Sequence, residues 1–204
     1  MSTPITVVLV EDQYLVRDAL SRLLNLEEDI RVVGEAADGV AGIEAVRRLK
    51  PMVTLLDVEM PRLDGIQAMR TMRRDSPDTV LAVLTTFGRP GYLERALKAG
   101  ARGFLLKEQP VARLAVQIRK LARGERVIDA ELAQAVLLEG PNPLSQRERD
   151  VLRRAREGEG VAEMAAALFL SPGTVRNYLS LAMQKLGTAN RAQAIREAER
   201  HGWL

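Results

Sequence analysis

Short apolar runs alternate with longer segments of helical pattern through the first 123 residues. The predicted strands are ITVVLV (5–10), RVVGEA (31–36), VTLLD (53–57), VLAVLT (80–85) and GFLLK (103–107). Between them apolar residues recur at helical spacing, as in Leu15, Ala19, Leu23 and Leu24, and again in Val111, Leu114, Ile118 and Leu121. Continuously apolar strands joined by helices form a parallel sheet that is buried on both faces. We therefore expect an α/β domain with a five-stranded, doubly wound parallel sheet over residues 1–123.

The pattern changes after Gly124, and no further strand is predicted. Asp129 can cap a short helix that runs to Leu138, and the segment Gly140-Pro141-Asn142-Pro143 ends that helix. Residues 124–143 are therefore interpreted as a partly helical linker.

From residue 144 onward all the signals are helical. Ser145 and Glu148 form a capping box for a helix that runs to about Glu157, and a short helix is predicted over 161–168. Ser171-Pro172 then begins a helix that ends before Gly187, and Asn190 can cap the last one. We expect a second, smaller all-α domain over residues 144–204.

Composition excludes several classes of protein. The chain has no Cys and a single His, His201, which excludes disulfides, thiolate chemistry and a His-rich metal site. No apolar run approaches the roughly 18 residues of a membrane span, and the start MSTPITVVLVEDQ lacks a basic region before its apolar segment. We expect a cytoplasmic protein without a membrane partner.

The net charge of +3 is too evenly spread to identify a nucleic-acid-binding half. Residues 1–123 carry 19 basic and 16 acidic side chains, and residues 141–204 carry 10 and 7. The evidence for any partner must therefore come from motifs.

Carboxylates follow two of the predicted strands at the point where each strand ends. Glu11 and Asp12 come directly after the first strand, and Asp57 ends the third. In an open parallel sheet, ligands bind beyond the carboxyl ends of the strands, so neighbouring strands would bring these three acids together. Carboxylates so placed repel one another unless a cation lies among them, and Mg²⁺ is suited to such oxygen ligands.

The fourth and fifth predicted strands end on Thr85 and Lys107. A site that transfers phosphate onto aspartate needs acids that hold a metal ion, one carboxylate nucleophile, a hydroxyl and an ammonium, and these strand ends carry all of them. Asp57 is the expected acceptor, and Glu59 would lie in the loop that follows, where its backbone carbonyl could serve as a metal ligand. Taken singly, each residue could be a helix cap or a solvated strand end. No glycine-rich turn follows the first strand, which disfavours a dinucleotide site.

With these residues in this order, the first domain resembles the receiver domain of two-component response regulators, which has a flavodoxin-like fold. The resemblance rests on the pair Glu11-Asp12, on LLDVEMPRLDG around Asp57, on Thr85 in VLTTF and on Lys107 in AGARGFLLK. It implies that Mg²⁺ binds Asp12, Asp57 and the backbone carbonyl of Glu59, with Glu11 assisting. It also implies that a histidine kinase supplies the phosphate.

The same resemblance implies a conformational switch. Thr85 would move toward the phosphate, and the aromatic residue three positions before the lysine, Phe104, would rotate inward. Phe104 lacks the hydroxyl of the tyrosine that is common in this family.

A helix, a short turn and a second helix that opens on Ser-Pro are typical of a helix-turn-helix, whose second helix enters the major groove. Arg176 suits guanine and Asn177 suits adenine, whereas Ser171, Thr174 and Lys185 suit phosphate contacts. Val175 fits either the core, as its helical spacing suggests, or a thymine methyl. The other reading of Arg176 and Asn177 is a solvated helix face.

Residues 142–204 resemble the LuxR-type DNA-binding domain of the NarL/FixJ class. The matching segments are NPLSQRERDVL, SPGTVRNYLSLAMQKLG and ANRAQAI. The segment GEGVAEMAAAL lacks the usual basic residue before the second helix, and Ser180 stands where some members carry lysine. The resemblance makes the last helix a dimerisation surface.

Together the two resemblances imply a transcription regulator rather than an enzyme. Phosphate on Asp57 would favour a dimer that binds two half-sites of double-stranded promoter DNA. One alternative is a DNA-binding protein that does not depend on phosphorylation and whose receiver is a docking module. Another is a phosphatase with Asp57 as nucleophile and Glu59 as acid, which would have no use for a helix-turn-helix.

Overall fold

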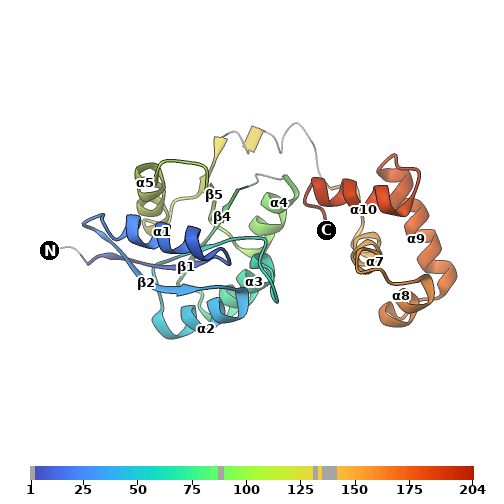
Figure 1. Cartoon of the computed structure of the whole chain (residues 1–204), viewed down its shortest axis with the longest axis horizontal. Helices are drawn as coiled ribbons and strands as arrows, with labels where there is room; N and C mark the ends of the chain where they lie inside the picture. Colours follow the sequence, from blue (N-terminus) through green and yellow to red (C-terminus); the bar gives the residue numbers. More distant parts are fainter. Residues whose placement is uncertain (1–2, 87–89, 131–132, 135–141) are drawn as a thin grey trace. The chain divides into compact units, whose positions relative to one another are not determined.

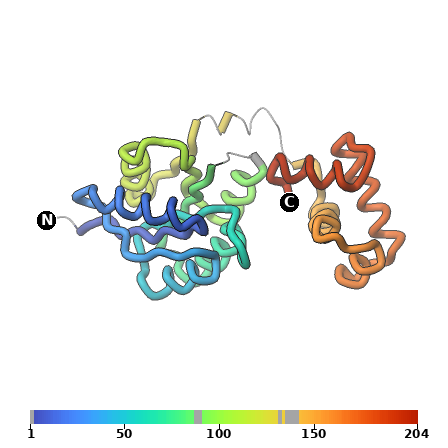
Figure 2. The backbone as a smooth tube through the Cα atoms, in the orientation of Figure 1, coloured from blue at the N-terminus to red at the C-terminus, as the bar shows by residue number. Residues whose placement is uncertain are grey.

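The structure of the protein is a computed structural model that describes residues 3–86, 90–130, 133–134 and 142–204. The chain forms two compact units, of which the first contains the parallel sheet with its helices and the second contains the helices from α7 onward (Figures 1 and 2). Within the described ranges, no helix is long and apolar enough to cross a membrane.

All five predicted strands are present in one parallel sheet. They are β1 (Ile5–Val10), β2 (Ile30–Ala36), β3 (Val53–Leu56), β4 (Val80–Thr85) and β5 (Gly103–Leu106). The strand order is β2-β1-β3-β4-β5-β6, and every neighbouring pair is parallel. Because the order reverses at β1 and β3, the carboxyl ends of these two strands flank the crevice where such sheets bind ligands.

The sixth strand corrects the prediction that no strand follows Gly124. This strand, β6 (Val127–Ile128), pairs with Gly103 and Phe104 of β5 at the edge of the sheet. A strand of two residues is too short to show an apolar period, so only its tertiary pairing reveals it.

Helices cover both faces of the sheet, as the doubly wound prediction requires. They are α1 (Tyr14–Leu24), α2 (Gly39–Leu49), α3 (Gly65–Asp75), α4 (Pro90–Ala99) and α5 (Val111–Ala122). Figure 1 shows α1 and α5 on one side of the sheet and α2 and α3 on the other. One buried cluster joins Leu24 of α1 and Leu114, Ile118 and Leu121 of α5 to β1 and β3.

Helix α1 does not bury all of the apolar residues that predict it. Leu24 is fully buried, but Leu15 is 79% exposed and Leu23 is 43% exposed. The apolar spacing therefore identifies the helix correctly but not the face that it turns to the core.

Part of the predicted linker packs onto the first unit. The carboxylate of Asp129 is buried and lies 3.0 Å from Arg113 Nη2. The N–H of Ala133 donates to the carbonyl of Asp129 at 2.9 Å, which agrees with a helix that begins after Asp129. The predicted continuation of this helix to Leu138 lies outside the described residues.

The second unit consists of helices whose caps match the sequence signals. They are α7 (Gln146–Arg156), α8 (Val161–Leu168), α9 (Pro172–Lys185) and α10 (Arg191–Arg200). Ser145 and Glu148 form the predicted capping box, Ser171 accepts from the N–H of Thr174, and Asn190 accepts from the N–H of Gln193. Gly187 takes a positive φ of 62° directly after the C-cap of α9, a conformation that glycine adopts without strain.

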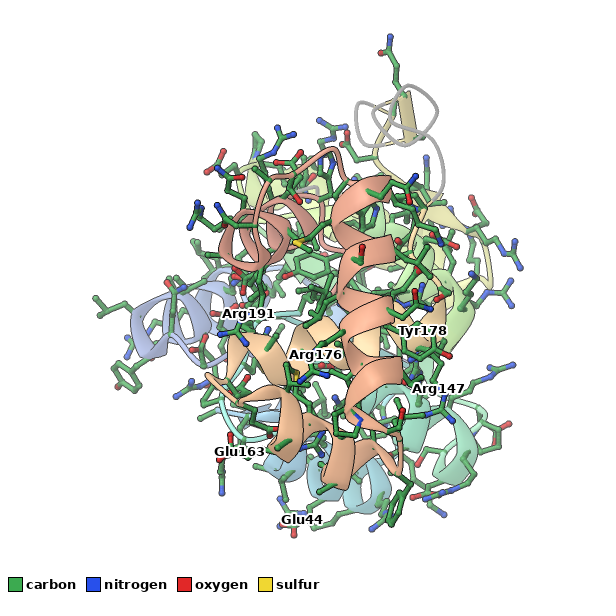
Figure 3. All side chains as sticks on the ribbon, turned by 90° about the vertical axis from the view of Figure 1, so that its right-hand side faces the viewer. Glu44, Arg147, Glu163, Arg176, Tyr178 and Arg191 are labelled. Atoms are coloured by element: carbon green, nitrogen blue, oxygen red, sulfur yellow. The ribbon has the colours of Figure 1, made fainter. Side chains whose placement is uncertain are left out.

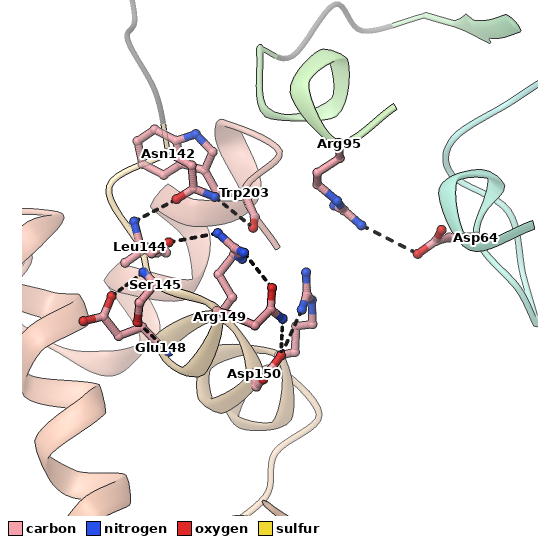
Figure 4. Close-up of polar contacts among 11 residues, drawn as sticks. Asp64, Arg95, Asn142, Leu144, Ser145, Glu148, Arg149, Asp150 and Trp203 are labelled. Carbon is pink, nitrogen blue, oxygen red and sulfur yellow. Dashed lines mark hydrogen bonds and ion pairs between the residues drawn. The ribbon is translucent and has the colours of Figure 1, made fainter. Parts of the chain in front are cut away.

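Polar contacts hold the start of α7 against the end of the chain (Figure 4). Asn142 accepts from the N–H of Leu144 at 2.9 Å and donates to the carbonyl of Trp203 at 3.4 Å. Trp203 and Leu204 are buried in the same apolar cluster as Val151 and Leu152 of α7. The last residues of the sequence are therefore part of the core of this unit.

Candidate functional site

The carboxyl ends of β1 and β3 bring the three predicted acids together. The N–H of Asp57 donates to the carbonyl of Val10 at 2.9 Å, so the residues that follow the two strands start side by side. One carboxylate oxygen from each of Glu11, Asp12 and Asp57 lies within 4.8 Å of the others. The predicted cluster therefore exists in the fold.

Lys107, just beyond the end of β5, supplies positive charge to this cluster. Its Nζ donates to Asp57 Oδ2 at 2.9 Å and forms an ion pair with Glu11 Oε2 at 2.6 Å. The Lys107 side chain is only 7% exposed, so solvent screens these pairs weakly. Although β4 separates β5 from β3 in the sheet, the ammonium of Lys107 reaches both Asp57 and Glu11.

Burial sets the protonation chemistry of the cluster. Burial raises the pKa of Asp57 and of Glu11 above their ordinary values, and the nearby ammonium of Lys107 opposes the rise in both. Burial acts to lower the pKa of Lys107, but its bonds to Glu11 and Asp57 outweigh burial and raise that pKa. Lys107 therefore stays charged beside Glu11 and Asp57.

The oxygens of Asp57 are held in different ways. Oδ2 faces Lys107, whereas Oδ1 accepts from the N–H of Val58 at 2.7 Å. Asp57 is 6% exposed. Both oxygens therefore have fixed partners at the edge of the sheet.

The acids fit a hard divalent cation. Asp12 Oδ1 is buried and has no hydrogen-bond partner among the described residues, although an unpaired buried oxygen is costly. In the part of the chain that the structure describes, three carboxylates gather here and one ammonium pairs with two of them, which leaves an excess of negative charge. The donor set consists of hard oxygens, which suits Mg²⁺.

The remaining predicted residues of the first unit lie in β4, in β5 and in the loop after β3. Thr85 ends β4 and is buried, and its carbonyl accepts from the N–H of Lys107 at 2.8 Å. Phe104 lies in β5 and is fully buried. Glu59 is exposed in the loop that follows Asp57.

Gly65, the first residue of α3, is a close neighbour of the site that the sequence did not single out. Its N–H donates to the carbonyl of Val58 at 3.0 Å, which folds the loop back onto the end of β3. A Cβ atom on Gly65 would lie 1.9 Å from the carbonyl oxygen of Asp57. Only a glycine can occupy this position without moving the backbone of Asp57.

Two arginines that the sequence did not single out contact the segments around the site. Arg17 of α1 donates to the carbonyl of Glu11 at 2.5 Å. Arg62, in the loop after β3, forms an ion pair with Asp38, which caps α2 through the N–H groups of Val40 and Ala41. No local pattern identifies these pairs, because their partners lie in other elements.

In the second unit, α9 presents the predicted recognition residues. Arg176 and Asn177 are exposed, and neither forms a side-chain hydrogen bond or ion pair with the described residues. Figure 3 shows Arg176 and Tyr178 on opposite sides of α9, with Arg147 of α7 projecting beside the helix on the Tyr178 side. Arg147 is also exposed and without such a partner in the described part of the chain, and it was not predicted.

Two of the predicted DNA-contacting residues have other contacts. Val175 is fully buried in the core of the second unit, so the core reading is correct and its side chain cannot reach a thymine methyl in this structure. Lys185 Nζ donates to Glu148 Oε2 at 2.8 Å. Burial acts to raise the pKa of Glu148, but the bonds from Lys185 and Ser145 outweigh it and lower that pKa. Lys185 therefore has a stable partner with which a phosphate would compete.

Ser171 and Thr174 line the start of α9. The hydroxyls of Ser171 and Thr174 lie 2.8 Å apart, and Ser171 also accepts from the N–H of Thr174 at 3.1 Å. Ser171 is exposed and Thr174 is partly exposed. Both hydroxyls remain accessible beside the helix N-terminus, where an anion is favoured.

Comparison with protein families matches both units. A model described as the response regulator receiver domain matches residues 7–119, and one described as bacterial regulatory proteins, luxR family, matches residues 142–198. The chain is 42% identical over 200 residues to the uncharacterized transcriptional regulatory protein YvfU of Bacillus subtilis, covering 98% of this chain and 100% of that protein. It is 39% identical to the transcriptional regulatory protein DesR of Bacillus subtilis, covering 98% and 99%.

Solved structures agree along almost the whole chain. The structure of RcsB from Salmonella enterica serovar Typhimurium, bound to promoter rprA in the presence of phosphomimetic BeF3−, matches with a TM-score of 0.71 and 27% identity. This match covers 97% of the present chain and 99% of the RcsB chain. The response regulator ChrA of a heme-sensing two-component system matches at 31% identity with a TM-score of 0.60 over 100% of both chains.

Proposed function

Since the chain belongs to the response regulators that join a receiver domain to a LuxR-type helix-turn-helix domain, we propose that Asp57 accepts phosphate from a histidine kinase and thereby controls DNA binding. Members of this family are transcriptional regulators that bind DNA through the helix-turn-helix, and they are not enzymes. The observation that carries the proposal is the contact between Lys107 and the buried carboxylate of Asp57, beside the acids Glu11 and Asp12.

Asp12, Asp57 and the carbonyl of Glu59 are the proposed ligands of Mg²⁺, with Glu11 assisting. The ion would supply positive charge that stabilises the phosphoryl group in transfer. The unpaired, buried Oδ1 of Asp12 and the excess of carboxylates support this assignment.

The chain's own groups position the reacting carboxylate. The N–H of Val58 holds Oδ1 of Asp57, and Lys107 holds Oδ2, so the carboxylate is oriented before phosphate arrives. Lys107 would then pair with the negative charge of the phosphoryl oxygens. The ammonium is already buried at the site, so its pairing with the phosphoryl oxygens requires no further burial of the Lys107 charge.

Thr85 and Phe104 are the proposed switch residues. Thr85 ends β4, and its carbonyl accepts from the N–H of Lys107. From this position the hydroxyl of Thr85 could turn toward a phosphate on Asp57. Phe104 is already fully buried in β5, so the switch would reorient a ring that is inward in this structure and would not bring an exposed ring inward. Phosphate would thereby shift an equilibrium between two receiver conformations.

On the DNA side, Arg176 and Asn177 are the proposed base-reading residues, and Ser171 and Thr174 the proposed phosphate contacts. Their exposure supports these roles, and for Arg176 and Asn177 so does the absence of partners within the described chain. Lys185 would contact phosphate only by giving up its bond to Glu148.

We propose a receiver domain over residues 1–123, whose sheet is extended by β6 of the linker, and a DNA-binding domain from residue 144. We also propose that the protein acts in the cytoplasm as a dimer after phosphorylation. The solved structure of two RcsB dimers bound to two parallel DNAs, with 27% identity and a TM-score of 0.67, supports a dimer on DNA. A dimer places two recognition helices on two half-sites, which raises affinity through effective concentration.

The test compares the wild type with Asp57→Asn after treatment with acetyl phosphate and Mg²⁺. The DNA probe is a duplex selected by the wild type from a random pool. We expect the wild type alone to become dimeric by light scattering and to bind the probe at least tenfold more tightly, on the order that effective concentration supplies. Fluorescence anisotropy of the labelled duplex measures the affinity.

The result that would reject the switch is equal affinity and an unchanged mass in solution for both proteins. The receiver would then be a docking module, and DNA binding would not depend on phosphorylation. Turnover of small phosphate esters by the wild type would instead revive the phosphatase alternative, which the family does not favour.

A further inference from the structure

Phe169 occupies the turn between α8 and α9 in an unusual conformation. It is the C-cap of α8, with φ 56° and ψ 46° in the left-handed region. Its side chain is 95% exposed. The left-handed conformation is strained for a residue with a Cβ, and glycine or asparagine is the usual choice at such a turn.

The aromatic ring contributes nothing to the packing of the second unit. Its neighbours Leu168 and Leu170 both pack against the apolar core of that unit, whereas Phe169 does not belong to it. Replacing the ring with a smaller polar group would therefore relieve backbone strain and remove no buried contact. The fold alone gives no reason for phenylalanine at this position.

The position of Phe169 relates it to the DNA-binding surface. It lies two residues before Ser171, the N-cap of α9, and two residues span at most about 7 Å. Figure 1 shows the short turn that joins α8 to α9. A duplex that meets the N-terminal turn of α9 therefore passes close to this ring.

We propose that Phe169 is a DNA contact of this protein, and that its ring packs against an apolar part of the duplex at the edge of the major groove. Two groups there share this chemistry, namely the methyl group of thymine and the deoxyribose of the backbone. The inference rests on the proposed contact of α9 with DNA and adds a residue to it. It also explains why an exposed, strained phenylalanine stands where glycine or asparagine would be easier.

The surroundings favour DNA over a protein partner. Among the described residues, Phe169 is the only exposed large apolar side chain beyond residue 116. A protein interface would surround such a ring with further exposed apolar side chains. The exposed residues that flank it in the sequence are small or polar, namely Ala166, Ser171, Pro172 and Gly173, and the exposed Arg176 and Asn177 follow in α9.

The experiment measures DNA affinity and thermal stability for full-length Phe169→Asn. The probe is the duplex selected by the wild type, labelled for fluorescence anisotropy. We expect the variant to bind about tenfold more weakly and to melt at the same or a higher temperature, because asparagine tolerates the left-handed conformation. The control is Leu26→Asn, at a site in the first unit that is 78% exposed, which should leave the affinity unchanged.

A second copy of the probe with uracil in place of thymine identifies the contacted group. If the ring contacts a thymine methyl, the wild type binds the uracil probe more weakly than the thymine probe, whereas Phe169→Asn binds the two probes equally. If it contacts deoxyribose, the two copies bind each protein equally, and the difference between wild type and variant remains.

Two results would overturn the inference. The first is binding of the probe by Phe169→Asn as tightly as by the wild type, which would assign the ring to a protein partner. The second is melting of the variant well below the wild type, which would make the ring a structural residue. Failure of the wild type to select any duplex would instead reject the helix-turn-helix function itself. Loss of binding by Arg176→Ala with normal binding by Phe169→Asn would keep that function and reject only the role of Phe169.

Discussion

Replacing Lys107 with alanine is expected to slow phosphorylation of the protein by acetyl phosphate about 100-fold or more. Lys107 Nζ lies 2.9 Å from Asp57 Oδ2 and would neutralise the phosphoryl oxygens during transfer. The substitution leaves Glu11, Asp12 and Asp57 without the ammonium that faces two of them. The rate is measured by the accumulation of phosphorylated protein in intact mass spectra.

The same variant should bind Mg²⁺ more tightly, on the order of tenfold, because an ammonium that repels the ion has been removed. Isothermal titration calorimetry measures this affinity without any phosphoryl donor. Opposite effects on the two measurements would separate the role of Lys107 in transfer from a general loss of the site.

Lys98→Ala is the matched control, since Lys98 is an exposed lysine that pairs only with Glu94 one helical turn away among the described contacts. It should phosphorylate and bind Mg²⁺ as the wild type does. If Lys107→Ala were phosphorylated at the wild-type rate, Lys107 would be a structural counter-ion only.

The second large effect is expected for Gly65→Ala, which should destabilise the receiver by about 3 kcal/mol or more. The added Cβ would meet the carbonyl oxygen of Asp57 at 1.9 Å, and that atom belongs to the backbone. The chain can relieve this overlap only by moving α3 or the end of β3. Urea unfolding measures the loss of stability, and phosphorylation of Asp57 should fail with it.

Gly173→Ala is the control for this substitution. Gly173 also lies in the first turn of a helix, but an added Cβ there would meet only Ser171 Oγ, at 3.7 Å. Its stability should equal or slightly exceed that of the wild type, because alanine favours helix. If Gly65→Ala were as stable as Gly173→Ala and the wild type, the backbone around Asp57 would move to accept the Cβ at little cost, contrary to this prediction.

The position of the acidic cluster was predictable from sequence, because the carboxyl ends of parallel strands lie at the same edge of a sheet. Apolar runs identified the five long strands, and the rule that carboxyl ends share one edge placed Asp57 beside Glu11 and Asp12. Helix caps were equally local, so Ser145 and Ser171 were identified from sequence alone.

The parts that escaped prediction depend on contacts between distant segments. Gly65 matters because two backbones approach closely, and no spacing of residue types reports such an approach. Lys185 could not be recognised as the partner of Glu148, which lies 37 positions away. Helical spacing favoured the core for Val175, but its place in the first turn of α9 also allowed a contact with DNA; the packing of the helices places it in the core.

The most direct test of the central claim is the mass of the wild type and of Asp57→Asn after treatment with acetyl phosphate and Mg²⁺, with the adduct located by peptide mapping. We predict one phosphoryl group on the wild type, on the peptide that contains Asp57, and none on the variant. An adduct of equal yield on both proteins, or none on the wild type, would contradict the assignment of Asp57 as the acceptor.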